Sequence, residues 1–454
     1  HVRSRRQRQM CIRDRLMIIL RTVKNISSLN IAASVLLFLA AILAAVVANS
    51  SLSPVYQDFL LQELHLRIGN FNLFSHGGHP LKMIEFINDC LMTVFFLAVG
   101  LEIKRELLVG ELSSVRKAAL PFIAACGGMV VPVVIYALSV ASGTPETRGM
   151  AIPMATDIAF SLGVLSLLGK RVPLSLKIFL TAFAVVDDIG GILVIALFYS
   201  ADVAYGYLIA AAVLYVFLYY MGKFGVTQKI FFLFFGVIIW YLFLQSGIHS
   251  TISGVILAFV IPARPRLDAG KYIERIRDII GEFPVSKSDN IVLTNAQIAT
   301  LKQVERASDY VISPLQSLED NLHGVVSFVI LPLFAFANAG VVFSGSGSIV
   351  GDVSIAVAAG LLLGKFLGIY LFTWLAVKSG VALMPAGMNW KNIAGVSLLG
   401  GIGFTVSLFI ANLSFADEYP ELLNQAKFGV LVGTVLAGVL GYVVLNWVLP
   451  EREK

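Results

Sequence analysis

Apolar stretches long enough to cross a bilayer recur along the chain from residue 31 onward. A helix needs about 20 mainly apolar residues to span roughly 30 Å of hydrocarbon. Only 14% of the residues are charged, against about a quarter in a soluble domain. The pattern predicts an all-α polytopic membrane protein and argues against a water-soluble enzyme. The expected spans are twelve: 31–49, 84–101, 118–141, 151–169, 175–199, 204–221, 229–245, 248–262, 325–342, 353–377, 391–414 and 425–448.

The positive charges of the connecting loops alternate with this series of spans. If the N-terminus is cytoplasmic, the outward loops carry few basic residues, namely Arg67, Lys82, Arg148 and Lys427. The inward loops carry Lys104, Arg105, Arg116, Lys117, Lys170, Arg171, Lys177, Lys223, Lys229, Lys378 and Lys391. Basic residues concentrate on the cytoplasmic side of membrane proteins. We therefore expect both termini to be cytoplasmic.

The net charge of +6 comes mainly from one end of the chain. Residues 1–16 contain six arginines and one aspartate, which is +5 of the +6, and they lack an apolar segment. We expect them to be an appended or disordered basic tail, with a basic segment that touches anionic lipid as the alternative. The charge is therefore no sign of nucleic-acid binding. The transporter domain is expected over 17–448, followed by a cytoplasmic tail at 449–454.

Two loops are more than connectors. Residues 64–80 alternate apolar and polar residues up to a Gly-Gly pair, which predicts an external β-hairpin. His76 and His79 flank its turn, and we interpret them as solvated histidines rather than metal ligands. Residues 264–322 are polar with a helical pattern, which predicts an insertion of amphipathic cytoplasmic helices.

Four ionisable residues lie in the middle of apolar spans: Asp157, Asp187, Asp188 and Lys365. A charge at this depth is costly, so such residues mark ion pathways or buried pairs. A structural ion pair is one reading, but it leaves three carboxylates against one ammonium. Asp187 and Asp188 point about 100° apart on a helix, so one can meet Lys365 while the other faces a cavity. Carboxyls that exchange protons in this setting can exchange them for a cation.

The ligand types narrow the identity of the cation. Carboxylate and hydroxyl oxygens suit hard ions, whereas zinc or copper would require His or Cys. Thr156, beside Asp157, can supply a neutral oxygen or bond back to its own helix, and the sequence leaves both open. His249 is interpreted as a hydrogen-bonding residue at a helix end rather than a proton relay.

Two spans carry residues that break helices. The fourth has Pro153 ahead of Thr156-Asp157, and the eleventh is rich in glycine, with Gly400, Gly401 and Gly403. Unwound backbone at membrane depth is tolerated where it lines a cavity or is buried in protein. These spans are the middle members of two triplets, 118–199 and 353–448, which predicts two inverted three-helix repeats with broken, crossing helices at the site.

Five segments resemble the NhaA-type bacterial sodium/proton antiporters, which are a known example of inverted-repeat transporters. They are MATDIAFSLGVLSLLGKRVP, VVDDIGGILVIALFY, LPLFAFANAG, GLLLGKFLGIYLF and GGIGFTVSLFI, in the family's order. The resemblance runs from about residue 28 to 448 and is interrupted by the insertion. It implies electrogenic, pH-regulated exchange of Na⁺ or Li⁺ for H⁺ by alternating access in the bacterial inner membrane. It also implies a homodimer formed through the 64–80 hairpin, and no cofactor.

The resemblance assigns roles to residues of this chain. Asp187 and Asp188 match the paired aspartates that bind the cation and carry protons, and Lys365 matches a lysine that pairs with the first of them. Asp157 and Thr156 match the pair at the helix crossing, where Asp157 offsets positive helix ends. Thr405 belongs to the broken eleventh span. A pH-sensing cluster also carries over, and its residues are Glu102, Arg105, Glu106, Glu319 and His323. From the residues alone, Glu102, Arg105 and Glu106 are also consistent with a solvated, salt-bridged helix end.

Other functions fit less well. A proton-coupled carrier of organic solutes would need more polar residues inside the spans. An intramembrane aspartyl protease needs aspartates that face each other across two helices, whereas Asp187 and Asp188 are adjacent. The sequence has no nucleotide-binding loop for an ATP-driven pump. A channel is disfavoured because a lysine and exchangeable carboxyls would trap the ion.

Overall fold

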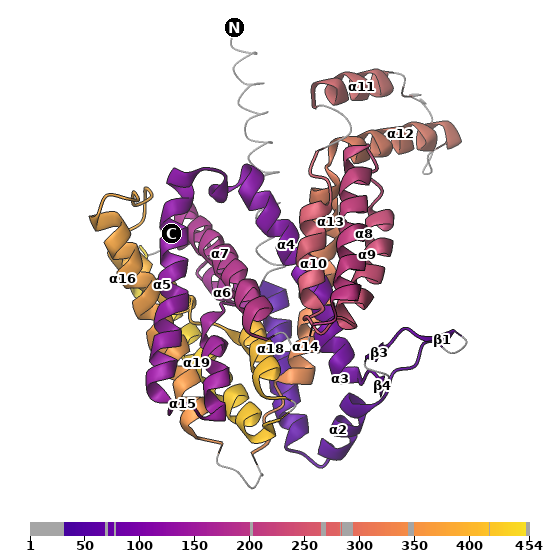
Figure 1. The fold of residues 1–454 in the computed structure, drawn as a ribbon. Helices are drawn as coiled ribbons and strands as arrows, with labels where there is room; N and C mark the ends of the chain where they lie inside the picture. The colour runs from indigo at the N-terminus through magenta and orange to yellow at the C-terminus, as the bar shows by residue number, and fades with distance from the viewer. Residues whose placement is uncertain are drawn as a thin grey trace.

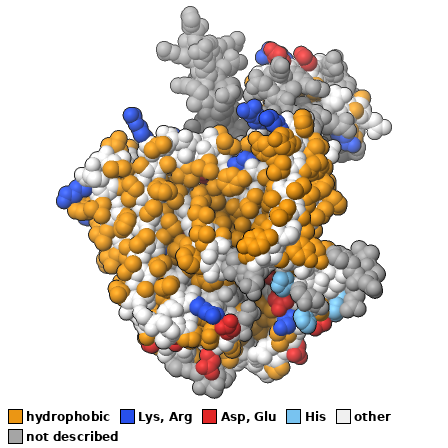
Figure 2. Space-filling view, viewed as in Figure 1, with side chains coloured by type: hydrophobic (Ala, Val, Ile, Leu, Met, Phe, Trp, Pro, Cys, Tyr) orange, Lys and Arg blue, Asp and Glu red, His pale blue; other side chains and the backbone are white. Residues whose placement is uncertain are grey.

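The computed structural model describes residues 31–68, 71–76, 79–199, 203–264, 269–281, 283, 294–343, 349–416 and 418–450. The expected basic tail at 1–16 and the last four residues lie outside this range. Helices dominate the fold and most of them run side by side in one bundle (Figure 1). A hydrophobic belt covers the middle of the visible face, with Lys and Arg at its upper edge (Figure 2). This distribution fits a protein embedded in a bilayer.

The described residues contain eight helices that are long and apolar enough to cross a membrane, and two bent pairs raise the number to ten. The eight are Ile31–Ala48, Met83–Val109 (α3 Met83–Phe86, η1 Ile87–Leu91 and α4 Met92–Val109), α5 Val115–Ser139, α7 Leu174–Phe198, α8 Tyr205–Lys223, Pro314–Asn338 (α13 Pro314–Val325, η5 Val326–Ile330 and α14 Leu331–Asn338), Asp352–Lys378 (α15 Asp352–Ala359, η6 Gly360–Gly364 and α16 Lys365–Lys378) and α19 Pro420–Val448. Two shorter apolar helices, α9 Lys229–Leu244 and α10 Thr251–Val260, occupy the seventh and eighth expected spans. The count of twelve spans stays a prediction.

The fourth and eleventh apolar segments are broken, as their proline and glycines predicted. In the fourth, the 3₁₀ segment η3 (Pro145–Met154) and α6 (Ile158–Leu167) are bent by 45°. In the eleventh, α17 (Trp390–Leu399) and α18 (Phe404–Phe415) are bent by 44°. The two breaks touch, because the main-chain N–H of Asp157 donates to the carbonyl of Ile402 (2.6 Å).

The broken pairs lie within a group of tightly packed helices that includes α5, α7, α15, α16 and α19. Helices α5 and α16 meet through Gly127 and Gly368, where a Cβ atom on either residue would collide with the carbonyl of the other. Small residues allow this close approach of two membrane helices. On the other side of the molecule α4 packs on α10, and α8 packs on α9 (Figure 1).

The predicted hairpin forms, but as two short ladders rather than one. Strands β3 (Ser75–His76) and β4 (His79–Pro80) pair with His76 opposite His79, at the expected turn. Ahead of them β1 (Arg67–Ile68) pairs with β2 (Phe71–Asn72). Asn72 explains the second ladder, because its side-chain oxygen accepts from the N–H groups of Leu66 (3.0 Å) and Phe74 (3.2 Å) and closes the bend locally.

The polar insertion contains α11 (Ala269–Gly281) and α12 (Asn295–Val311), which pack on each other beyond the end of the bundle (Figure 1). The next helix, α13, begins at Pro314 and continues into the ninth apolar segment. Residues 314–322, expected as part of the insertion, therefore extend that segment. Ser313 starts the helix by accepting from the N–H of Gln316 (3.2 Å), and Leu315 and Leu318 are buried.

Short 3₁₀ turns connect several of these helices. They are η2 (Glu111–Ser113), between α4 and α5, and η4 (Gly169–Arg171), between α6 and α7. The short helix α2 (Ser53–Leu61) leads from the first apolar helix to the hairpin. At η4, the guanidinium of Arg171 donates to the carbonyls of Asn446, Leu449 and Pro450, and thereby satisfies the last turn of α19.

Candidate functional site

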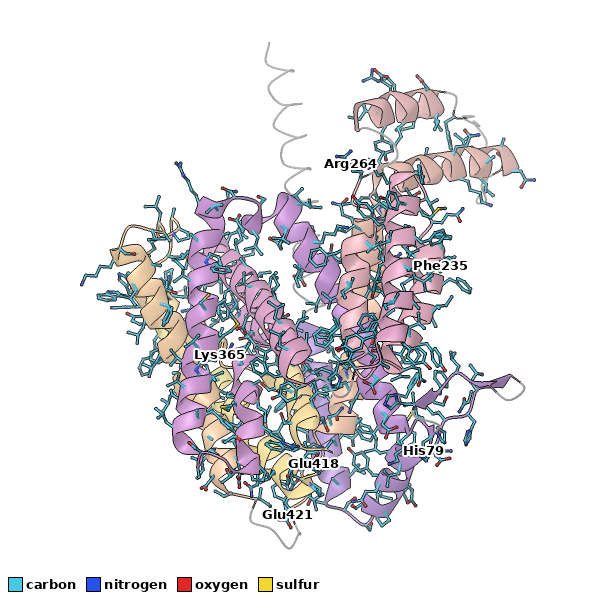
Figure 3. All side chains as sticks on the ribbon, in the orientation of Figure 1. His79, Phe235, Arg264, Lys365, Glu418 and Glu421 are labelled. Atoms are coloured by element: carbon cyan, nitrogen blue, oxygen red, sulfur yellow. The ribbon has the colours of Figure 1, made fainter. Side chains whose placement is uncertain are left out.

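Asp187 and Asp188 lie at the middle of α7, and both side chains are buried. The ammonium of Lys365, the first residue of α16, lies 2.6 Å from Oδ2 of Asp187. Both side chains of this ion pair have no exposed surface. The ammonium also lies 5.6 Å from the centre of the Phe183 ring, one turn earlier on α7. Figure 3 shows Lys365 among the packed helices at mid-height of the bundle.

One oxygen of each aspartate is buried without a hydrogen-bond partner among the described residues. These atoms are Oδ1 of Asp187 and Oδ1 of Asp188. Buried polar atoms are nearly always hydrogen-bonded, and exceptions commonly mark functional sites. The charges that bear on Asp188 are those of Asp187, Glu102, Asp157 and Lys365. Two adjacent carboxylates with free oxygens are suited to bind a hard cation or protons.

Asp157 lies at the crossing of the two broken pairs and bonds to both. Its Oδ1 accepts from the N–H of Phe160 (2.9 Å) and caps α6. Its Oδ2 accepts from Oγ1 of Thr405 (2.6 Å) and from the N–H of Thr405 (3.2 Å), at the start of α18. Helix N-termini carry partial positive charge, so one carboxylate here stabilises two of them.

The opposite ends of the broken helices are also satisfied by side chains. Oγ1 of Thr156 donates to the carbonyl of Gly400 (2.8 Å), and Oγ of Ser161 donates to the carbonyl of Leu399 (3.0 Å). Leu399 is the last residue of α17 and Gly400 is its C-cap. The backbone is non-helical from there through Gly403. Thr156 therefore bonds across the crossing rather than to its own helix. Pro153 is the next-to-last residue of η3, in the other broken segment of the crossing.

A second group of charges lies at the far end of α4. Nη1 of Arg105 pairs with Oε1 of Glu319 on α13 (2.8 Å), and Nη2 pairs with Oε1 of Glu106 (3.2 Å). Glu102 lies one turn earlier on α4 and is half-buried. The structure thus brings four of the five expected residues of this cluster together. His323 is exposed on α13 and forms no ion pair among the described residues.

The sequence did not reveal the role of Lys104 or the π turn that precedes Lys365. Lys104 donates to the carbonyls of Ala258, Phe259 and Ile261 and caps the end of α10. The π-helical turn η6 directly precedes Lys365. Such turns are frequent at functional sites. A lysine at a helix end is a usable signal for the cap, whereas the glycines at both ends of η6 do not by themselves distinguish a π turn from an α turn.

Two cavities open near the hairpin end of the bundle. The first, of about 690 Å³, is lined by His76 and His79 of the hairpin, by Asp89 and His249, and by Asn412 of α18. The ring of His249 lies 6.3 Å from that of Phe409 at its inner wall. The second, of about 750 Å³, is mostly apolar and is lined by η3 together with α5, α7 and α18. Neither is lined by Asp187 or Asp188.

Known sodium/proton antiporters match this chain over almost its whole length. The family model described as Na⁺/H⁺ antiporter 1 matches residues 24–445. A protein of Bacteroides thetaiotaomicron named Na(+)/H(+) antiporter NhaA is 74% identical over 438 residues, covering 96% of this chain and 100% of the relative. One of the same name from Bacteroides fragilis is 75% identical over 437 residues, with the same coverage. A more distant relative, Na(+)/H(+) antiporter NhaA 1 of Saccharophagus degradans, is 42% identical over 424 residues, covering 92% and 90%.

Proposed function

The chain belongs to the Na⁺/H⁺ antiporter 1 family and is a multi-pass membrane sodium/proton antiporter; from this premise we propose that Asp187 and Asp188 are the shared site for Na⁺ and H⁺. Protons and the cation compete for the same carboxylate oxygens, so binding of one requires release of the other. The exchange is electrogenic and extrudes Na⁺, or Li⁺, against entering protons. The transported ions are substrates, and the protein requires no cofactor.

The observation that carries this proposal is the asymmetry between the two aspartates. Asp187 is held by Lys365 at 2.6 Å, whereas Asp188 has no basic residue bonded to it among the described residues. A cation that enters between the two carboxylates weakens the attraction between Asp187 and Lys365, since it offers the same negative charge a second partner. Proton binding to the carboxylates after the cation leaves would restore neutrality.

The broken helices supply the second element of the mechanism. Asp157 compensates two helix N-termini while Thr156 and Ser161 satisfy the facing C-terminal carbonyls. The crossing is thus electrically balanced without the transported ion. A balanced crossing is free to shift between an inward-facing and an outward-facing arrangement around a fixed site, which is alternating access.

We further propose that the cluster of Glu102, Arg105, Glu106 and Glu319 regulates the exchange by pH, with His323 at its edge. Its support is geometric, because Arg105 ties α4 to α13 through Glu319. Protonation of Glu319 would break this tie between two helices. Of the two site aspartates, Asp188 interacts electrostatically with Glu102, which connects the cluster to the binding site.

The finer architecture belongs to the same proposal. We propose twelve spans, with inverted repeats at 118–199 and 353–448, in the bacterial inner membrane with both termini cytoplasmic. Two copies form a homodimer through the 64–80 hairpin, surrounded by membrane lipid. The hairpin supports this role because it projects beyond the bundle (Figure 1).

The proposal is tested in inside-out vesicles from a host that lacks its own antiporters. The vesicles are energised, Na⁺, Li⁺ or K⁺ is added in turn from pH 6.5 to 8.5, and the proton gradient is followed by dye dequenching. Na⁺ and Li⁺, but not K⁺, should collapse the gradient with the unmodified protein. Asp187→Asn and Asp188→Asn should abolish this response, while Asp58→Asn, an exposed aspartate of α2, should not.

Equal expression and thermal unfolding of the variants must accompany this comparison. Asp188→Asn that moves Na⁺ at the unmodified rate would show that the cation binds elsewhere. A response to no cation at any pH would favour an organic-solute carrier over the antiporter.

A further inference from the structure

Helices α11 and α12 form a cytoplasmic arm whose role the exchange mechanism does not explain. The arm leaves the bundle after α10 and returns at Ser313, the N-cap of α13. Both helices lie across the direction of the bundle helices, beyond the end of α8 and α9 (Figure 1). We refer to these two helices as the α11–α12 arm.

The arm and the external hairpin lie on the same flank of the molecule. Nε2 of Gln245, at the end of α9, donates to the carbonyl of Ser75 (2.6 Å) and holds the hairpin against that helix. Figure 3 shows His79 of the hairpin, Phe235 of α9 and Arg264 at the root of the arm along this one flank. A partner that meets the hairpin on one side of the membrane therefore also faces the arm on the other side.

Apolar side chains on one face of α11 are partly buried, and those on another face are exposed. Tyr272, Ile276 and Ile279 are half-buried on the arm. Ile273 and Ile280 are 59% and 60% exposed. They are seven residues apart and therefore share one helix face. Together the two isoleucines form a small apolar patch on this face, which is suited to pack against a second helix.

We propose that this open face of α11 packs against the same face of α11 in a second copy of the chain. This inference rests on the proposed homodimer, but not on the transport mechanism. Two copies with the same orientation in a membrane are related by a two-fold axis along the membrane normal. A helix that lies across this axis meets its mate antiparallel, as in other isologous contacts.

The residues of α11 suit this antiparallel pairing. With the axis near Arg277, Ile273 lies opposite Ile280 of the partner subunit, and the contact repeats on the other side of the axis. Glu274 then comes within one helical turn of Arg277 of the partner subunit, and both side chains are exposed in a single copy. The face is thus complementary to itself in apolar contact, and Glu274 of each copy offsets the two Arg277 side chains that meet at the axis.

Cysteine cross-linking of the full-length chain in membranes tests this geometry. Cys11, Cys90 and Cys126 are first replaced by serine, and retained Na⁺/H⁺ exchange shows that the background is folded. Ile273→Cys and Ile280→Cys chains with different tags are then co-expressed and oxidised. We expect several-fold more cross-linking between these two chains than within Ile273→Cys alone, and self-cross-linking of Arg277→Cys. Lys302→Cys, exposed on α12, controls for random collision.

A second variant measures the contribution of the contact. Ile273→Glu with Ile280→Glu should lower the dimeric fraction in detergent several-fold, while Na⁺/H⁺ exchange in vesicles is retained. An unchanged dimeric fraction, or cross-linking only to other proteins, would overturn the proposal. So would a dimer in which cysteines of the hairpin cross-link and those of α11 do not. Loss of Na⁺/H⁺ exchange in the Asp188→Asn protein leaves this test unaffected.

Discussion

Lys365 is the residue on which the stability of the site depends most directly. Its ion pair with Asp187 is fully buried, and removal of one partner leaves an uncompensated buried charge. We expect Lys365→Ala to lower the free energy of unfolding by about 3–5 kcal/mol, measured by denaturant titration in detergent. Lys378→Ala is the matched control, because it removes an exposed lysine from the same helix.

The double variant distinguishes the pair from a general packing effect. Lys365→Ala combined with Asp187→Ala removes both charges and should recover much of the loss. Additive losses in the double variant would mean that Lys365 stabilises α16 by some other contact. Unchanged unfolding of Lys365→Ala would argue against the pairing itself.

At the residue scale, the sequence alone located the four buried charges, because each interrupts an apolar run. It did not determine the hydrogen bonds of Thr156, whose hydroxyl reaches Gly400 on a distant helix. The acceptor that this hydroxyl reaches depends on which segments cross in three dimensions. The role of Ser161 was also missed, because its acceptor lies on another segment and because serine is common in membrane helices without any special role.

At the element scale, Asp157 joins two helix N-termini, and Thr405 supplies the shorter of its bonds to α18. Thr405→Val removes the hydroxyl at nearly constant shape, whereas Thr405→Ser keeps it. Hydrogen bonds to charged groups contribute about 1.5–3 kcal/mol. We expect Thr405→Val to lose a free energy of unfolding of this size and to raise the apparent KM for Na⁺, and Thr405→Ser to do neither. Equal effects of the two variants would exclude this bond as the cause.

A chain of three asparagine side chains connects separate spans beside the cavity that His76 and His79 line. Nδ2 of Asn412 donates to Oδ1 of Asn338 (2.8 Å), and Nδ2 of Asn338 donates to Oδ1 of Asn88 (2.8 Å). The first bond joins α18 to α14 and the second joins α14 to η1, so the first must break if α18 moves away from α14. Asn338→Ala and Asn412→Ala should therefore be non-additive in the free energy of unfolding, with a coupling of about 0.6–2 kcal/mol. Full additivity in this double-mutant cycle would show that the chain is not a unit.

The elements themselves were only partly predictable. The two breaks followed from Pro153 and the glycines, because these residues weaken helical backbone directly. The hairpin was predicted as one ladder, and the side chain of Asn72 divides it into two. The π turn η6 depends on how α15 and α16 pack on α5 and α19, which no local pattern reveals.

At the scale of the whole molecule, the two ends of the bundle differ in chemistry. One end carries the hairpin and the cavity with His76, His79 and Asp89. The other carries the Arg105–Glu319 pair and the α11–α12 arm. Length and hydropathy predicted the series of spans, and loop charges predicted which end is cytoplasmic. Neither could predict that the arm and the hairpin share a flank, since this depends on the packing of α8, α9 and α10.

The orientation of the molecule is open to a direct test. Basic loop residues prefer the cytoplasmic side, so the hairpin should be external and the arm internal. In the cysteine-free background, His79→Cys should react with a membrane-impermeant maleimide in right-side-out vesicles. Lys302→Cys should react only after the vesicles are permeabilised, and both positions are exposed enough to be labelled. Labelling of Lys302→Cys in sealed vesicles would reverse the assignment of sides, and with it the location of the Arg105–Glu319 cluster relative to the cytoplasm.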